Sequence, residues 1–503
     1  MMKSSYEQGE AQLHPAVRER AGSPTLEQWG ERGPSMLGRL AEIDLVTLDA
    51  AVSTGPALAR ARRLLTNRQR LAPGRPAHLL LHAHSPREED LAREAAAALA
   101  PLVAAVHLRR LRSRTEVASE ALALHRQLWP AEEEARRKAR LLLLIRRGGA
   151  GKPQFIAPFV GGAGTTCGAW TPIVAYRRGR QTWIAGTRPP EQERGAEPIR
   201  GFLRGNYAQG VCPVACSFCY LRGLHGMGIK SVALNLEDVV PELEQLPRGS
   251  VVNWAELGGP VEEDPWFVDE QGQGSLVQTI LDLASARGIV SFLLTKGVYE
   301  PYLRLEGRLA LVAISLNPAA ISAQFEPGGA PPEARLRGLA WAIEHGALDH
   351  TIRLGPIIPV AGYRQAYHEL FAQIRDILGP RLKRMTVDIL RFSPQMPRVL
   401  RASLPEEQVA PLLEELEPEV VAHKYRPSVT RQQRLYRWVR LLLARYGLGQ
   451  VQTTPCKADP REALQFLKAG VISSMPCACH ISYRLRAELQ RGPMPVLNRA
   501  PQE

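Results

Sequence analysis

The sequence has no long apolar run. None of its 503 residues lies in an unbroken apolar stretch of the roughly 20 residues that a membrane-spanning helix needs. The first residues carry no apolar segment behind Lys3, so they do not resemble a secretory signal. Hydrophobic residues make up 45% of the chain and charged residues 23%, which is the balance of a folded chain and not of a disordered one. These absences predict a folded protein that makes no contact with a membrane.

Cysteine is also scarce. The chain contains seven, an odd and modest number for its length. Small secreted proteins that depend on disulfides are much richer in cysteine, so a disulfide scaffold is not expected. Reduced thiols or metal ligands in a reducing compartment fit this number better, and we therefore expect a cytoplasmic protein.

The positive charge is unevenly distributed. Residues 1–200 contain 31 Lys and Arg against 20 Asp and Glu, whereas residues 201–503 contain 33 against 30. A basic region beside a near-neutral one predicts contact with a polyanion such as nucleic acid. Arginine-rich helices with a solvated face would produce the same excess, so this alternative stays open.

Composition divides the chain into four regions. Residues 1–150 are rich in Ala, Leu, Glu and Arg, which favour helices, and they predict a mostly helical basic region. Residues 151–200 predict a hairpin around residues 178–180 and then a linker. Residues 201–400 predict the core domain, and residues 401–503 a helical region with a cysteine-rich tail.

Within residues 201–395, short apolar strands alternate with amphipathic helices. Helices are expected at residues 276–287, 334–345 and 365–378, and a further basic helix at residues 431–446. Repeated strand–helix units predict a parallel sheet, either open or curled into a barrel. In such folds functional side chains gather at the carboxyl ends of the strands.

The run GVCPVACSFCYL places Cys212, Cys216 and Cys219 in a C-x3-C-x2-C spacing. Three thiolates on one loop can bind three irons of a cubane cluster and leave the fourth iron open. A zinc site with His225 as fourth ligand matches no common spacing, and three unrelated buried thiols are the other alternative. The motif resembles the signature of the radical S-adenosylmethionine (SAM) superfamily, in which an aromatic residue, here Phe218, precedes the last cysteine.

This resemblance implies a [4Fe–4S] cluster on the three cysteines, with SAM as cofactor. It also implies SAM contacts at consecutive strand ends, where each residue alone could instead cap a helix or a turn. Glu256 would accept the ammonium of SAM, and Lys296 would pair with its carboxylate. Ser315 and Asn317 would bond its ribose and methionine ends. Ile357, at the end of the fifth strand, would contact the adenine.

The nearer resemblance is to the spore photoproduct lyase family, over about residues 200–470. The matching runs are CPVACSFCYL, VNWAEL, LLTK, ISLNPAAISAQFEPGGAPPEARL, GPIIPVAGYRQAYHELF and ILRFSP, with fainter matches in KYRPSVTRQQRLYRWVRLLL and TTPCKADPREALQFL. The resemblance implies a partial (β/α)6 barrel and a thymine photoproduct in DNA as the founding substrate. The predicted fold class is therefore α/β: a partial (β/α)6 radical SAM barrel with a mostly helical N-terminal extension and a small C-terminal extension.

The chain departs from this family at the residues that return hydrogen to the product. The family has a cysteine just after the second strand, but residues 256–264 contain none. It also uses tyrosines on both sides of the last cluster cysteine; Tyr220 is retained, whereas Phe218 has no O–H to donate. Both remain candidates for contact with the cofactor. Candidate hydrogen donors are Tyr220 and the cysteines of the C-terminal region, which could instead bind a second metal or have no role. These are Cys456, Cys477 and Cys479.

The sequence thus predicts a radical SAM enzyme, lyase-like, that acts on a DNA lesion or a nucleic-acid base. Its expected partners are SAM, DNA and a reductant such as flavodoxin or ferredoxin. One alternative is the same radical chemistry on a peptide or small metabolite, because the donor cysteine is missing. Another is a non-catalytic, metal-bearing protein that binds nucleic acid.

Overall fold

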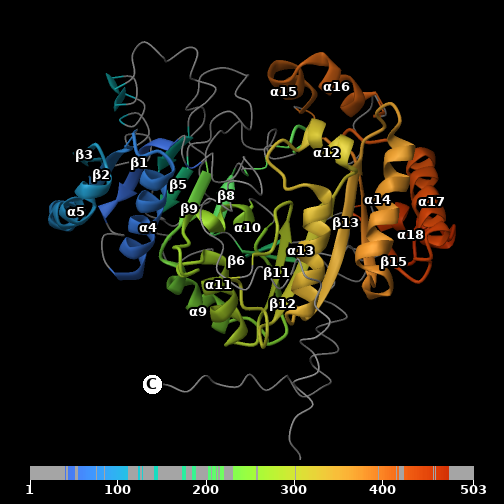
Figure 1. The fold of residues 1–503 in the computed structure, drawn as a ribbon, viewed down its shortest axis with the longest axis horizontal. Coiled ribbons are helices and arrows are strands. Elements are labelled where there is room, and N and C mark those ends of the chain that lie inside the picture. Colours follow the sequence, from blue (N-terminus) through green and yellow to red (C-terminus); the bar gives the residue numbers. More distant parts are fainter. Residues whose placement is uncertain are drawn as a thin grey trace, which may run out of the picture.

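The computed structural model describes residues 40–474 with gaps. The longest gaps are residues 129–140, 145–172, 188–201 and 220–229, and residues 256–258 and single positions near the cysteine motif form shorter ones. The described strands form two sheets, and Figure 1 shows the N-terminal sheet in blue to green beside the second sheet, whose strands run to orange. No helix in the described ranges is long and apolar enough to cross a membrane.

The first sheet has seven strands in the order β3-β2-β1-β4-β5-β9-β8. Its neighbours pair in parallel except β8 and β9, which are antiparallel. Helices α4 (Gly55–Leu71) and α5 (Pro86–Leu99) supply the crossovers after the first two strands, as parallel pairing requires. The strands are β1 (Ile43–Asp49), β2 (His78–Ala83), β3 (Ala105–Arg110), β4 (Leu141–Leu144), β5 (Ile173–Tyr176), β8 (Ala208–Gly210) and β9 (Lys230–Ala233).

This sheet corrects the expectation of a mostly helical N-terminal region. The helix formers do build α4 and α5, but buried apolar strands stand before and after them. Runs as short as LVTL or HLLL fit a buried strand and a buried helix equally well, so composition alone favoured the wrong element.

The expected hairpin around residues 178–180 is also wrong, because β5 lies in the first sheet and β6 (Ile184–Thr187) in the second. The predicted domain boundaries stay predictions, although β8 and β9 join the first sheet from beyond residue 200.

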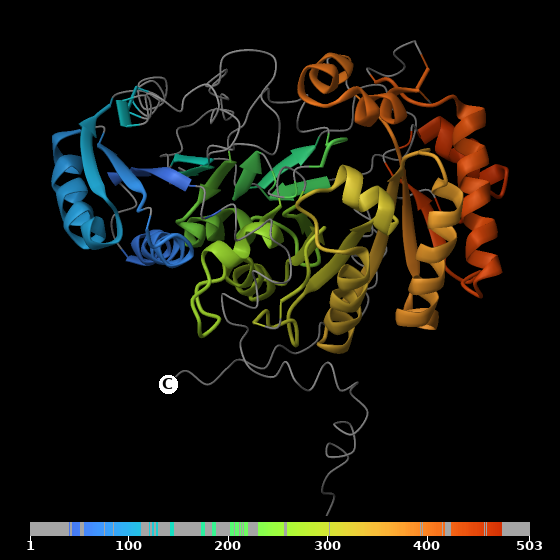
Figure 2. The same ribbon diagram turned by 45° about the horizontal axis from the view of Figure 1, so that its top comes forward.

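The second sheet has eight strands in the order β15-β14-β13-β12-β11-β10-β7-β6. All neighbours from β7 to β15 are parallel, and only β6 is antiparallel. The sheet curls with its helices on the outer side (Figures 1 and 2), which confirms the predicted partial barrel. Besides β6, its strands are β7 (Phe202–Gly205), β10 (Val251–Asn253), β11 (Val290–Thr295), β12 (Ala310–Leu316), β13 (Asp349–Ile357), β14 (Arg384–Ile389) and β15 (Gln452–Pro455).

The helices around this sheet lie close to the predicted positions. The segments expected at residues 276–287, 334–345, 365–378 and 431–446 form α11, α13, α14 and α17. Strand β12 is buried along its whole length, as expected for a parallel strand covered on both faces. The helices are α9 (Val240–Glu244), α10 (Pro260–Glu263), α11 (Leu276–Ser285), α12 (Ala319–Phe325), α13 (Pro332–Glu344), α14 (Tyr363–Ile377), α15 (Met396–Ser403), α16 (Glu406–Leu413), α17 (Val429–Arg445) and α18 (Pro460–Lys468).

Helix α4 joins the two sheets. The side-chain amide of Asn67, which is buried, donates to the backbone oxygens of Trp266 (3.0 Å) and Val268 (2.9 Å). Arg60 forms an ion pair with Glu237. Buried polar groups need such partners, so these contacts fix the N-terminal sheet against the barrel.

Candidate active site at the carboxyl ends of the barrel strands

The cysteine loop follows β7 and β8 at the start of the barrel. Cys216 is buried, and Cys212 and Cys219 are half-buried. The backbone of Ser217 donates to the carbonyl oxygen of Phe325 at 2.8 Å. On the same segment, the Gly328 amide donates to the Val214 oxygen at 2.9 Å. The loop is therefore held by the last residue of α12 and by the residues that follow this helix, beyond the carboxyl end of β12.

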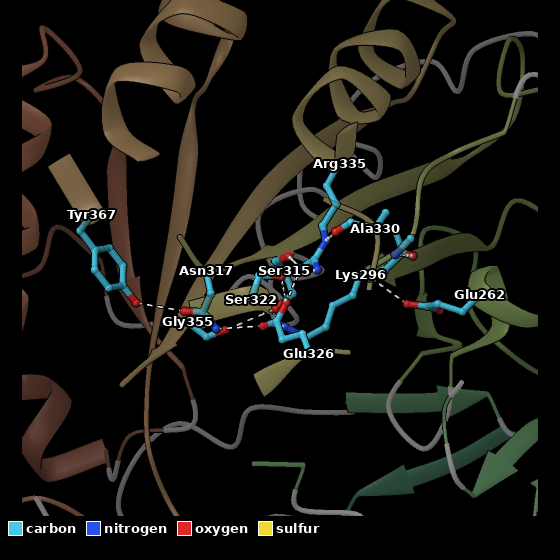
Figure 3. A network of polar contacts seen from close by, with 12 residues as sticks. Glu262, Lys296, Ser315, Asn317, Ser322, Glu326, Ala330, Arg335, Gly355 and Tyr367 are labelled. Atoms are coloured by element: carbon cyan, nitrogen blue, oxygen red, sulfur yellow. Dashed lines mark hydrogen bonds and ion pairs between the residues drawn. The ribbon is translucent and has the colours of Figure 1, made fainter. Parts of the chain in front are cut away.

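A buried carboxylate, Glu326, stands at the centre of a polar network beside this loop (Figure 3). One oxygen, Oε1, accepts from Lys296 Nζ at 2.6 Å and from the Asn317 amide at 2.9 Å. The other, Oε2, accepts from the Ser322 hydroxyl at 3.0 Å and pairs with Arg335 at 2.7 Å. Four donors thus converge on one carboxylate, from the ends of β11 and β12 and from α12 and α13.

Arg335 is fully buried and supports this network from α13. Besides Glu326, its guanidinium donates to the backbone oxygens of Ala330 (2.7 Å) and Ser315 (2.8 Å). It also donates to the Ser322 hydroxyl at 3.0 Å. A planar guanidinium with five donors can bind several acceptors in fixed directions, which a lysine at this position could not do.

The charges in the network alter two pKa values. Burial by itself raises the pKa of Glu326, but the positive charges of Lys296 and Arg335 outweigh it and lower the pKa to about 2. Burial raises the pKa of the Cys216 thiol above its usual range, while the Lys296 charge acts in the opposite direction. Without a metal the Cys216 thiol is thus protonated, and a bound cation would favour the thiolate.

The residues present suit an iron–sulfur cluster in their chemistry. Three thiols come from one short loop, and thiolates are the ligands such clusters use. A Cβ at Gly259 would lie 2.5 Å from Cys212 Sγ and 2.7 Å from Glu262 Oε2, so this glycine leaves space beside the first cysteine. Among the residues that the structure describes, no three or more His, Cys, Asp or Glu side chains form a ready metal site. The assignment of the three ligands therefore stays a prediction.

Several residues predicted from the strand ends do lie together. Lys296 follows β11, and Ser315 and Asn317 lie at the end of β12. Lys296 Nζ also lies 5.2 Å from the centre of the Phe218 ring, next to the last cysteine. Ile357 is buried at the end of β13. Their roles toward SAM stay predictions.

Tyr220, Glu256, Cys477 and Cys479 lie outside the described residues. Cys456 is described: it is buried just after β15, and its amide donates to the Val387 oxygen at 2.9 Å. It packs in an apolar cluster separate from the one that includes Cys216.

Besides Ser322, four residues of the site were not predicted from the sequence. Glu326 and Arg335 form its central ion pair, and the Tyr367 hydroxyl donates to Asn317 Oδ1 at 3.0 Å. Glu262 is buried, and its Oε1 accepts from the Lys296 amide at 2.7 Å. A signal was present, since FEPGG and PEAR place charges within otherwise apolar or small residues. Spacing alone could not show that these charges meet.

The glycine beside Cys212 gives a direct test of this loop. Replacing Gly259 by alanine is expected to lower the iron bound after reconstitution by at least about half, because the methyl group would lie too close to Cys212 Sγ and Glu262 Oε2. Iron content per chain is the measurement. Gly74→Ala serves as control, because a Cβ there meets nothing within 4 Å and the backbone at Gly74 does not have a positive φ. Equal iron content in the Gly259 variant and the wild type would contradict the placement of Cys212.

Solved structures of spore photoproduct lyase are similar to this chain. The lyase complexed with dinucleoside spore photoproduct is 15% identical, and the match covers 82% of this chain and 98% of that chain with a TM-score of 0.47. A mutant lyase with bound AdoMet and dinucleoside spore photoproduct is 16% identical over the same shares, also with a TM-score of 0.47. No family model and no curated protein matches the chain. These solved structures are of the family that the sequence motifs resemble.

Proposed function

We propose that this chain is a radical SAM enzyme that acts on a DNA lesion or a nucleic-acid base. The observation that carries the proposal is the position of the three-cysteine loop. It lies at the carboxyl ends of the parallel barrel strands, next to a buried network of charged and amide side chains. The [4Fe–4S] cluster, when bound by Cys212, Cys216 and Cys219, would supply one electron to cleave SAM into methionine and a 5′-deoxyadenosyl radical that takes a hydrogen atom from the substrate.

The residues around the loop would bind and orient SAM. The Lys296 ammonium has three donor positions and gives one to Glu326, so it can still pair with the carboxylate of SAM. Asn317 is fixed from both ends by Glu326 and Tyr367, which suits a group that must hold a ligand in one orientation. Ile357 would provide an apolar contact, and Glu256 and Tyr220 are proposed to complete the site.

Positive charge supports nucleic acid as the substrate. Beyond the basic N-terminal region, α17 exposes Arg434, Arg437 and Arg445, which form no ion pair within the described part of the chain. Arginines without counter-ions favour a phosphate backbone. A cytoplasmic location and a low-potential reductant such as flavodoxin or ferredoxin complete the proposal.

The missing cysteine in residues 256–264 instead favours a different substrate for the same chemistry, such as a peptide or small metabolite.

The test is production of 5′-deoxyadenosine from SAM. Protein reconstituted anaerobically with iron and sulfide and reduced with dithionite is expected to release it. Turnover is expected to rise with ultraviolet-irradiated DNA, but not with undamaged DNA or a peptide mixture. A rise with the peptides alone would favour the second candidate. A zinc-loaded chain inert toward SAM would overturn both and favour a metal-bearing binding protein.

A further inference from the structure

Three buried or nearly buried charges face the cysteine loop. Glu326 and Arg335 are inaccessible to solvent, and only 14% of the Lys296 side chain is exposed. The residue before Glu326 accepts the backbone hydrogen bond of Ser217, next to Cys216, and Lys296 lies over Phe218, next to Cys219. Cys216 and Cys219 thus each have a charged residue of this network in their immediate surroundings.

We infer that Arg335, Lys296 and Glu326 set the reduction potential of the cluster proposed on this loop. The inference rests on the proposed function. A cluster gains one negative charge when it is reduced, so a neighbouring cation favours the reduced form and a neighbouring anion disfavours it. Because the three side chains are shielded from water and salt, their effect is screened much less than that of surface charges. Arg335 would act on the cluster through its charge. It is also a positioning residue, since its ion pair with Oε2 holds Glu326 in place.

The two signs of charge predict opposite shifts. Arg335→Met removes a cation, and the ratio of reduced to oxidised cluster at a fixed potential is expected to fall about tenfold, a shift of 59 mV for a one-electron couple. Lys296→Met removes the second cation and is expected to shift the potential in the same direction. Glu326→Gln keeps the size of the side chain, removes the anion, and is expected to shift it about as far in the opposite direction.

Two further variants separate charge from structure. Arg335→Lys keeps the positive charge but loses most of the guanidinium hydrogen bonds, so its potential is expected to stay near that of the wild type while its melting temperature falls. Arg337→Met on the same helix removes an exposed arginine that pairs with Glu333, and neither property is expected to change. If Arg335→Met does not fold, Lys296→Met still tests the loss of a cation.

The measurement is a redox titration of the reconstituted full chain without SAM, followed by electron paramagnetic resonance. Shifts of opposite sign for the cation and anion variants, with Arg335→Lys unshifted, would support the inference. Shifts of the same sign, no shift, or a shift in Arg335→Lys equal to that in Arg335→Met would overturn it. A wild-type chain that takes up no iron would overturn the proposed function and this inference with it, whereas a reducible cluster insensitive to these charges would overturn the inference alone.

Discussion

Replacing Cys216 by alanine is expected to abolish release of 5′-deoxyadenosine and to leave the chain with little bound iron after reconstitution. A cluster held by three thiolates would lose its protein ligand at one iron when Cys216 is removed, and Cys216 is the buried one of the three. No 5′-deoxyadenosine is expected above the detection limit, because no open iron would then be held in place for SAM. Iron and sulfide content and product are measured on the same preparation.

Cys456 provides the matched control for this variant. It is also a buried cysteine of the barrel, but it packs in a different apolar cluster. Cys456→Ala is therefore expected to keep the iron content of the wild type and to keep cleaving SAM. If Cys456 is the hydrogen donor, only the conversion of the DNA substrate is expected to fall. Equal iron contents in the Cys216 and Cys456 variants would contradict the assignment of the cluster loop.

The site was predictable wherever chain order determines position. Parallel strands bring their carboxyl ends to one edge, so reading Lys296 after one strand and Ser315 and Asn317 after the next was enough to place them together. The cysteines were recognisable as one site because all three lie in a single short run of the sequence. What chain order does not determine is which polar groups pair there. Chain order did not indicate that Glu326 would accept one of the three donor positions of Lys296, which leaves two for the carboxylate of a ligand.

The first sheet was not predictable from the sequence for a related reason. A parallel pair such as β1 and β2 joins residues about thirty positions apart, and no local pattern records that pairing. The two short strands β5 and β6 looked like a hairpin because they are near in sequence, yet β5 pairs with β9, 57 positions further along, and β6 pairs with β7, 15 to 21 positions further along. Non-local pairing in each case outweighed the local preference of the segment.

The metal-free protein is expected to become less stable in acid because of Glu326. Its pKa is lowered from 4.5 to about 2 in the folded chain, so the unfolded chain takes up a proton at this group more readily. The stability from its charged form is fully present above about pH 4.5 and is lost as the pH falls toward 2. A shift of this size corresponds to about 3 kcal/mol. Unfolding by urea, followed by circular dichroism at several pH values, measures it.

Glu326→Gln is expected to lower the free energy of unfolding at pH 7 by roughly 3–5 kcal/mol, because Lys296 and Arg335 would remain buried without their counter-charge. The difference from the wild type is expected to shrink as the pH falls from 4.5 toward 2, since protonation then neutralises the native carboxylate as well. Glu333→Gln is the control: its exposed pair with Arg337 lies on α13, the helix that carries Arg335, and a change well below about 1 kcal/mol is expected. A Glu326 variant as stable as the wild type at neutral pH would show that this carboxylate does not balance the two cations.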